Sequence, residues 1–218
     1  IGIVIKDSDL IVQEYTSGLN LPVMIDFIDK NMLVAEKDGT VRIIKDGILD
    51  SEPILQLEVS NASEEGLLGI LVQNNDVFLH YTTSDVDDDT TSNWFTKYTW
   101  NGEKLIDPIE LLSFHSGAGD HNSGVMIEDS NGIVFGAIGD MGYVGGQYDP
   151  DNFTLTENEE MLYQNSSVGN EPVGSILSLN TPRDIYAIGI RNTFGLDIDP
   201  VTGILWDTEN GPNLFDEI

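Results

Sequence analysis

The sequence predicts an all-β fold built from repeated antiparallel pairs of strands. Its apolar runs are short, are bounded by Gly, Asn, Asp and Pro, and almost never show a sustained helical periodicity. The chain has 22 glycines, and Asp-Gly or Asn-Gly dipeptides separate many of the runs, as tight hairpins require. The expected strands are 23–28, 32–35, 41–44, 77–81, 133–138, 175–179, 185–188 and 204–206.

A unit of two strands recurs four times along the chain. Each unit has a polar residue, an apolar strand, a turn rich in Asp, Asn or Gly, and a second apolar strand that ends at a polar residue. The units cover residues 20–39, 64–84, 121–142 and 191–212. Repeats of roughly 45 to 70 residues with this pattern are typical of propeller blades, and a sandwich with coincidental hairpins is the alternative.

In a propeller, the polar ends of these units would meet on one face. The innermost strand of each blade lines the central channel, and antiparallel pairing returns the second strand to the same face. A small molecule is expected to bind at such a channel mouth. The residues that this rim would collect are Asn20, Glu64 or Glu65, His121 and Arg191, with Glu36, Asp140, Glu209 and the turn Gly211-Pro212.

The fourth unit stops at Ile218 before any outer strands have followed it. About three and a half blades cannot close a ring, and an open propeller leaves a bare strand edge. We therefore expect residues 1–218 to be the N-terminal part of a single β-propeller domain whose C-terminal blades are missing.

Charge and composition limit the possible partners. The chain has 38 acidic and 9 basic residues and a net charge of −29, which argues against nucleic acid or an anionic membrane surface as a partner. This charge suggests either an affinity for cations or, as we favour, solubility in a salty setting. There is no cysteine, which excludes disulfides and thiolate metal sites. No apolar run approaches the roughly 18 residues of a membrane helix, so we expect no membrane insertion.

Five motifs in order carry a resemblance to a known family. They are Gly66-Leu67-Leu68-Gly69, Asp120-His121-Asn122-Ser123-Gly124, Ile138-Gly139-Asp140, Arg191-Asn192 and Glu209-Asn210-Gly211-Pro212. From about Gly18 onward the chain resembles the soluble glucose/sorbosone (aldose sugar) dehydrogenases that depend on pyrroloquinoline quinone (PQQ), which are six-bladed β-propellers. The resemblance implies oxidation of the C1 hydroxyl of an aldose to a lactone with PQQ and Ca²⁺. It also implies an external electron acceptor and a location outside the cytoplasm, in the periplasm, at the cell surface or secreted.

The same resemblance implies roles for individual residues. His121 looks like the general base, since an imidazole can accept a proton near neutral pH. Asp120 would orient it and contact the substrate, and Arg191 and Asn192 would face the quinone oxygens. Glu64 and Asp140 match further acidic positions around the substrate and cofactor.

Three positions would serve calcium. The backbone carbonyls of Gly211 and Pro212 match ligands of the Ca²⁺ that polarises the quinone, and oxygen ligands suit this hard cation. Glu217 matches a carboxylate that some relatives use for a structural Ca²⁺.

Departures from the family pattern keep other functions open. Thr193-Phe194-Gly195 stands where Pro-Gln-Gly is usual, and Ser178 replaces a usual arginine. The basic residues that hold the cofactor's carboxylates come from later blades, so we expect this segment to be inactive by itself. The main alternative is a non-catalytic extracellular propeller that binds a partner and has lost the cofactor. A Ca²⁺-dependent propeller hydrolase such as a lactonase is a third possibility, against which Arg191 beside the metal argues.

Overall fold

The computed structural model describes residues 6–7, 9–84, 91–116, 119–141, 173–180, 185–210, 216 and 218, the side chains of residues 115 and 116 excepted. All regular elements in these ranges are β-strands, so the predicted all-β class is confirmed. In this part of the chain, no helix is long and apolar enough to cross a membrane. The proposed calcium positions Gly211, Pro212 and Glu217 lie outside the described residues.

The strands form four antiparallel sheets that follow one another in chain order. The first sheet contains β1 (Pro22–Ile28), β2 (Asn31–Glu36), β3 (Thr40–Lys45), β4 (Ile48–Leu49) and β5 (Leu55–Gln56). The second contains β6 (Leu67–Gln73), β7 (Asp76–Ser84), β8 (Thr91–Trp100) and β9 (Leu105–Ser116). The third contains β10 (Met126–Glu128), β11 (Val134–Ile138), β12 (Ser175–Ser178) and β13 (Ile185–Ile188). The fourth contains β14 (Thr193–Ile198) and β15 (Leu205–Glu209).

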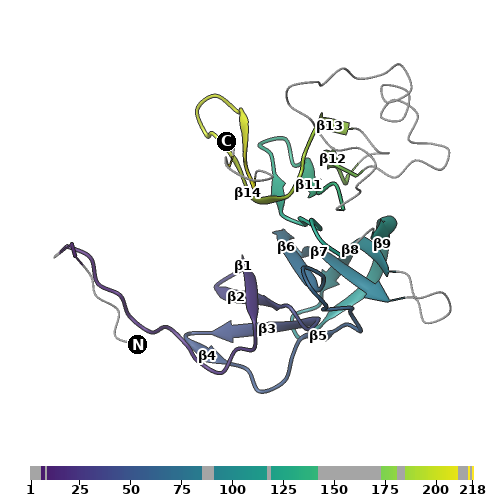
Figure 1. Ribbon diagram of the computed structural model, residues 1–218. Helices are drawn as coiled ribbons and strands as arrows, with labels where there is room; N and C mark the ends of the chain where they lie inside the picture. The colour runs from purple at the N-terminus through teal and green to yellow at the C-terminus, as the bar shows by residue number, and fades with distance from the viewer. Residues whose placement is uncertain are drawn as a thin grey trace, which may run out of the picture.

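Neighbouring sheets meet through their first strands. Strand β1 contacts β6, β6 contacts β10, and β10 contacts β14. Figure 1 shows the sheets arranged one after another from the purple N-terminal sheet to the yellow C-terminal hairpin. This is the arrangement that the repeat predicts for propeller blades, with the first strand of each unit innermost.

The four predicted units are the four hairpins β1–β2, β6–β7, β10–β11 and β14–β15. Their turns contain residues with positive φ, among them Asp29 (54°), Asn74 (57°) and Gly132 (82°). Asp, Asn and Gly are the residues that adopt this conformation most readily, which explains why the turns could be recognised locally. In three of the hairpins the register shifts near the start of the first strand. Such irregularities redirect side chains at the rim of a sheet.

Strand β9 was not among the strands predicted from the sequence. It pairs with β8 at the edge of the second sheet and contains Pro108 in its interior. Proline cannot donate a hydrogen bond to a neighbouring strand, so a run that contains it does not look like a sheet strand. An edge strand tolerates it because one side of its backbone needs no partner.

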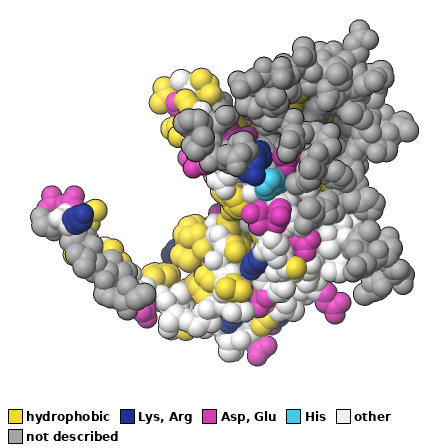
Figure 2. All heavy atoms as spheres, in the orientation of Figure 1, with side chains coloured by type: hydrophobic (Ala, Val, Ile, Leu, Met, Phe, Trp, Pro, Cys, Tyr) yellow, Lys and Arg dark blue, Asp and Glu magenta, His cyan; other side chains and the backbone are white. Residues whose placement is uncertain are grey.

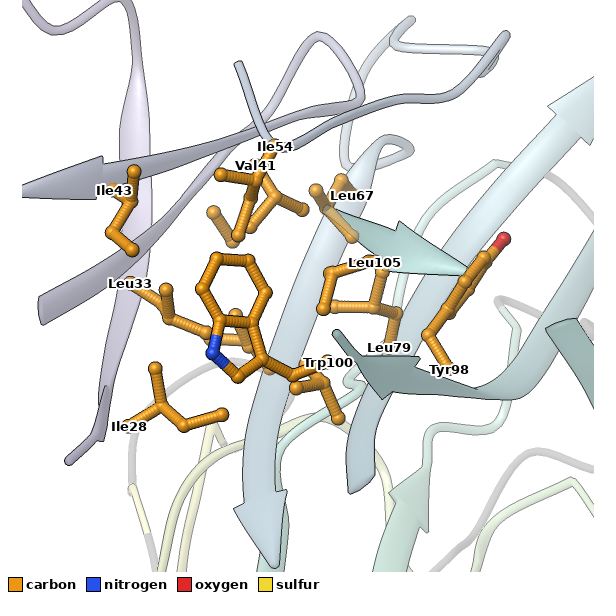
Figure 3. Packing of buried hydrophobic residues seen from close by; sticks show 13 residues of the cluster. Ile28, Leu33, Val41, Ile43, Ile54, Leu67, Leu79, Tyr98, Trp100 and Leu105 are labelled. Atoms are coloured by element: carbon orange, nitrogen blue, oxygen red, sulfur yellow. The ribbon is translucent and has the colours of Figure 1, made fainter. Parts of the chain in front are cut away.

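The hydrophobic core lies between successive sheets. The indole of Trp100 on β8 sits among aliphatic side chains of the first two sheets, including Ile28 and Leu33 (Figure 3). A second cluster joins the second and third sheets through Phe78, Phe95 and other buried residues, and a third cluster joins the third and fourth sheets. Side chains therefore interlock across every junction between blades, which holds the inner strands in order.

Apolar side chains remain exposed on the first and the last sheet. Val23, Ile25 and Phe27 alternate along β1, and all three are exposed. Phe194 and Trp206 are exposed on the fourth sheet. Yellow apolar side chains are visible on the face shown in Figure 2.

One core position is occupied by a histidine. His80 on β7 is fully buried, and in the described part of the chain neither ring nitrogen has a hydrogen-bond partner. Its ring centroid lies 4.5 Å from that of Phe95 and 6.5 Å from that of Phe114. Burial disfavours the charged imidazolium and lowers the pKa of His80 from 6.5 to about 3.

We predict that His80 makes the protein sensitive to mild acid. The unfolded chain binds a proton at this histidine below about pH 6.5, whereas the folded protein does not until about pH 3. Stability should therefore fall as the pH drops through this window, by about 1.4 kcal/mol per pH unit. His80→Leu removes this contribution, so its advantage over the wild type in urea unfolding should grow by about 3 kcal/mol between pH 7 and pH 4.5. Carboxylates titrate in both proteins and cancel in the comparison, and parallel pH profiles would contradict the prediction.

Candidate functional site

The predicted rim residues come together at the ends of the inner strands. Glu64 precedes β6, His121 precedes β10, Asp140 follows β11, and Arg191-Asn192 precedes β14. Hydrogen bonds join all of them, and we call them the rim cluster. On the face shown in Figure 2, histidine, basic and acidic side chains lie beside one another.

His121 is paired with Asp140. Its Nδ1 lies 2.6 Å from Oδ1 of Asp140. An ionised carboxylate only accepts hydrogen bonds, so the hydrogen is on Nδ1 and the lone pair of the neutral ring is on Nε2. Nε2 has no hydrogen-bond partner among the described residues, and 19% of the side chain is exposed. The ring therefore offers a proton acceptor to solvent or to a bound molecule.

Glu64 joins three of the loops. Its Oε2 accepts a hydrogen bond from the backbone N–H of His121 (2.7 Å) and another from Nδ2 of Asn192 (3.1 Å). The N–H of Glu64 itself donates to the carbonyl of Gly119 (3.3 Å). Hydrogen bonds to an ionised acceptor are stronger than neutral ones, so this carboxylate fixes the loop before β10 against the loop before β14.

Both the oxygen and the nitrogen of the Asn192 side-chain amide form hydrogen bonds. Only 2% of the residue is exposed. Its Oδ1 accepts from the backbone N–H and the hydroxyl of Ser123 at 3.3 and 3.4 Å, opposite the Nδ2 that donates to Glu64. Oγ of Ser123 accepts in turn from the N–H of Thr193 (2.9 Å). Thr193, where proline is usual in the family, thus supplies an N–H that proline lacks.

Arg191 brings a cation next to this network. Its carbonyl accepts from the N–H of Asp140 (2.9 Å), and its own N–H donates to Oε2 of Glu209 (2.9 Å). One guanidinium nitrogen, Nη1, donates to the carbonyl of Asn210 (2.8 Å). The other guanidinium nitrogens have no hydrogen-bond partner in the described part of the chain, so the cation retains donors for a ligand.

Asp120 does not hold the ring of His121. Its Oδ1 accepts from the hydroxyl of Ser63 (2.6 Å), and the partner of the ring is Asp140. The residue that contacts the ring is thus not the expected Asp120 but one that follows β11. Asn20 and Glu36 were also expected at the rim. The backbone N–H of Asn20 donates to Oε1 of Glu36, and Oε2 of Glu36 lies 3.8 Å from Nη1 of Arg42.

The loop before β10 has an unusual backbone. His121 (φ 58°), Ser123 (φ 52°) and Gly124 (φ 105°) all adopt positive φ. For residues other than glycine this conformation is unfavourable by about 1–3 kcal/mol each unless the surroundings compensate. Here the contacts of Glu64 and Ser123 compensate. Sequence reasoning did not identify Ser63 and Ser123 as supports, because serines in loops are too common to single out.

The calcium positions are not tested, since Gly211, Pro212 and Glu217 lie outside the described residues. Within the described ranges, no group of three or more His, Asp or Glu side chains is arranged to hold a metal ion. The rim cluster places an imidazole, carboxylates and a guanidinium next to one another.

Comparisons with known proteins indicate the family of the chain. A family model described as Glucose / Sorbosone dehydrogenase matches residues 19–218. An uncharacterized protein of Synechocystis is 25% identical over 209 residues, which cover 86% of this chain and 51% of that protein. Quinoprotein glucose dehydrogenase B of Acinetobacter calcoaceticus is 30% identical over 140 residues, which cover 56% of this chain and 29% of that protein.

Solved structures share the fold. The PQQ-bound aldose sugar dehydrogenase of Streptomyces coelicolor superposes with a TM-score of 0.72 at 21% identity, over 95% of this chain and 62% of that chain. A structure described as glucose dehydrogenase gives a TM-score of 0.73 at 18% identity, over 94% of this chain and 62% of that chain. These folds are β-propellers, so the predicted propeller is confirmed. The chain spans about half or less of the curated relatives' length.

We predict that Glu64→Ala destabilises the protein by about 1–3 kcal/mol, because two donors lose their acceptor in a partly buried place. Glu64→Gln should cost less, since its carbonyl oxygen can still accept both hydrogen bonds. The measurement is urea unfolding at pH 7. Glu52→Ala is the matched control, because Glu52 is exposed and should change stability by no more than about 0.5 kcal/mol. Equal stabilities of Glu64→Ala and the control would contradict the structural role.

Proposed function

Because this chain belongs to the Glucose / Sorbosone dehydrogenase family, we propose that the whole protein is a quinoprotein that oxidises the C1 hydroxyl of an aldose to a lactone. The observation that supports this function is the 2.6 Å hydrogen bond between His121 and Asp140, beside the cation of Arg191. In this proposal the cofactors are PQQ and Ca²⁺, and the electrons pass to an external acceptor. The protein works outside the cytoplasm.

His121 is the general base. Its Nε2 takes the proton of the C1 hydroxyl, while the Nδ1–H keeps donating to Asp140. The ring becomes positively charged when it takes the proton, and the carboxylate of Asp140 stabilises that charge. Glu64 holds the backbone of His121 so that the ring need not move during the transfer.

Arg191 provides the complementary charge. Its free guanidinium donors fit the oxygens of a quinone, and a fixed cation favours the negative charge that develops there. Asn192 would contribute its remaining N–H at the same place, next to Glu64. When bound, PQQ would supply the acceptor for the hydride of C1, and Ca²⁺ at Gly211 and Pro212, with a structural ion at Glu217, would supply polarisation and support. The donor set of the described residues therefore fits the cofactor.

The charge of the chain bears on the partners. A net charge of −29 disfavours the approach of anions on average. The binding rate of a neutral sugar does not depend on this charge, whereas an anionic electron acceptor would associate more slowly. We therefore expect a neutral or cationic acceptor, and a rate with a cationic acceptor that falls as salt is added.

The test of the proposed function is dye reduction by the full-length protein supplied with PQQ, CaCl₂, an aldose and an artificial electron acceptor. Reduction that needs both the sugar and PQQ is expected. Absence of reduction in the folded protein would reject the enzyme. Binding of a sugar or protein ligand in that case would favour the non-catalytic propeller module.

We predict that His121→Asn and Asp140→Asn both lower kcat, the first by about 10²–10⁴-fold, because a general base contributes a factor of that size. Asp140→Asn leaves the ring in place but loses the carboxylate that fixes its Nδ1–H, so kcat should fall while KM changes little. Steady-state kinetics with the dye measure both constants.

The control for this pair is Asp76→Asn. Asp76 forms a 2.8 Å ion pair with Lys97 at the end of β7 away from the rim, and its replacement should leave kcat unchanged. Full activity of Asp140→Asn would show that the pair with His121 has no part in the reaction.

A further inference from the structure

His80 is an anomaly for a core residue. Its ring is completely buried beside Phe95 and Phe114, and neither nitrogen has a hydrogen-bond partner among the described residues. An unpaired polar group in such a place costs about 1–3 kcal/mol relative to an apolar one. A leucine or phenylalanine would avoid this cost, so something other than core stability accounts for the imidazole.

The ring lies against the loop that carries His121. A Cβ on Gly124 would stand only 2.2 Å from Nδ1 of His80, so the backbone of Gly124 rests directly on the ring. Gly69 pairs with His80 across β6 and β7, and a Cβ on Gly69 would lie 2.0 Å from the carbonyl oxygen of Gly124. Gly69 and His80 thus form a seat in which Gly124 is held without space for any side chain.

The seat acts on the strained part of the loop. Gly124 ends the segment in which His121 and Ser123 have positive φ. Its N–H donates to the carbonyl of Ala137 (3.1 Å), which fixes it along β11. The ring of His80 sets the height of Gly124, meaning the distance of its backbone from the second sheet. A change in that height moves Ser123 and His121 with it, because their backbones follow directly.

We infer that His80 is a positioning residue of the rim cluster, whose imidazole sets the height of Gly124 and so keeps His121 facing Asp140. A five-membered ring with a nitrogen as its nearest atom allows the glycine a closer approach than a phenyl ring would. The seat consists of Gly69 and His80, and its effect on catalysis rests on the proposed function.

The test is a double-mutant cycle between His80→Ala and Gly124→Ala in the full-length protein. One readout is the NMR signal of the His121 Nδ1 proton, assigned by its loss in His121→Gln. The other is kcat. Gly124→Ala alone should abolish the signal and lower kcat about 100-fold, the cost of a small misplacement of a catalytic group. In the His80→Ala background the methyl group that Gly124→Ala adds has room. The double variant should therefore show the signal that Gly124→Ala alone loses, and the Gly124→Ala change should lower kcat only about tenfold or less, from backbone strain alone.

His80→Phe repeats the test with Gly124 unchanged, in case Gly124→Ala does not fold. The larger ring should displace the loop, shift the Nδ1 signal and lower kcat with KM unchanged. The control is Val134→Ala. Val134 lies in the core cluster of Phe95 and Phe114, at the end of β11 away from Asp140, so this variant should lose stability and keep the signal.

Two results would overturn the inference: an equal effect of Gly124→Ala in both backgrounds, or an unchanged His121 signal in His80→Phe. If the wild-type protein reduces no dye, the proposed function fails, while the NMR signal still decides whether His80 positions the loop.

Discussion

The carboxylate of Glu64 is the contact on which the rest of the site depends. A single oxygen, Oε2, accepts from the backbone of His121 and the side chain of Asn192, which belong to the loops of two other sheets. Because an ionised carboxylate only accepts, it also fixes which way the amide of Asn192 points, with Oδ1 turned to Ser123. Three loops are thereby locked to one another. The orientation of His121 follows from these hydrogen bonds together with Asp140.

The regular part of the fold could be predicted because its signals are local. Turns at Asp29, Asn74 and Gly132 need residues that tolerate positive φ, and the chain shows them directly. The recurrence of the hairpins predicted propeller blades, since each unit repeats the same order of strand, turn and strand. Strand β9 was not predicted because Pro108 interrupts its strand pattern. Only the position of β9 at a sheet edge makes that proline acceptable.

The members of the rim cluster could be predicted from the sequence, whereas most of their pairings could not. Antiparallel return brought Glu64, His121, Asp140 and Arg191 to one rim, as expected. Asp120 is the sequence neighbour of His121, yet its carboxylate accepts from Ser63, and Asp140 is the partner of the ring instead. His80 gave no signal, because a histidine in an apolar strand looks the same whether it supports a loop or fills a gap. Such pairings depend on contacts between strands, which spacing alone does not specify.

The long reach of Glu64 also sets an order of events during folding. Its partners lie 57 and 128 residues further along the chain. Closing loops of this size costs more entropy than closing a hairpin, so contacts of this kind form late. Each hairpin can form soon after its synthesis, but Glu64 obtains both of its partners, His121 and Asn192, only when the third and fourth sheets have docked. A nascent chain therefore carries finished strands long before it carries the complete rim cluster.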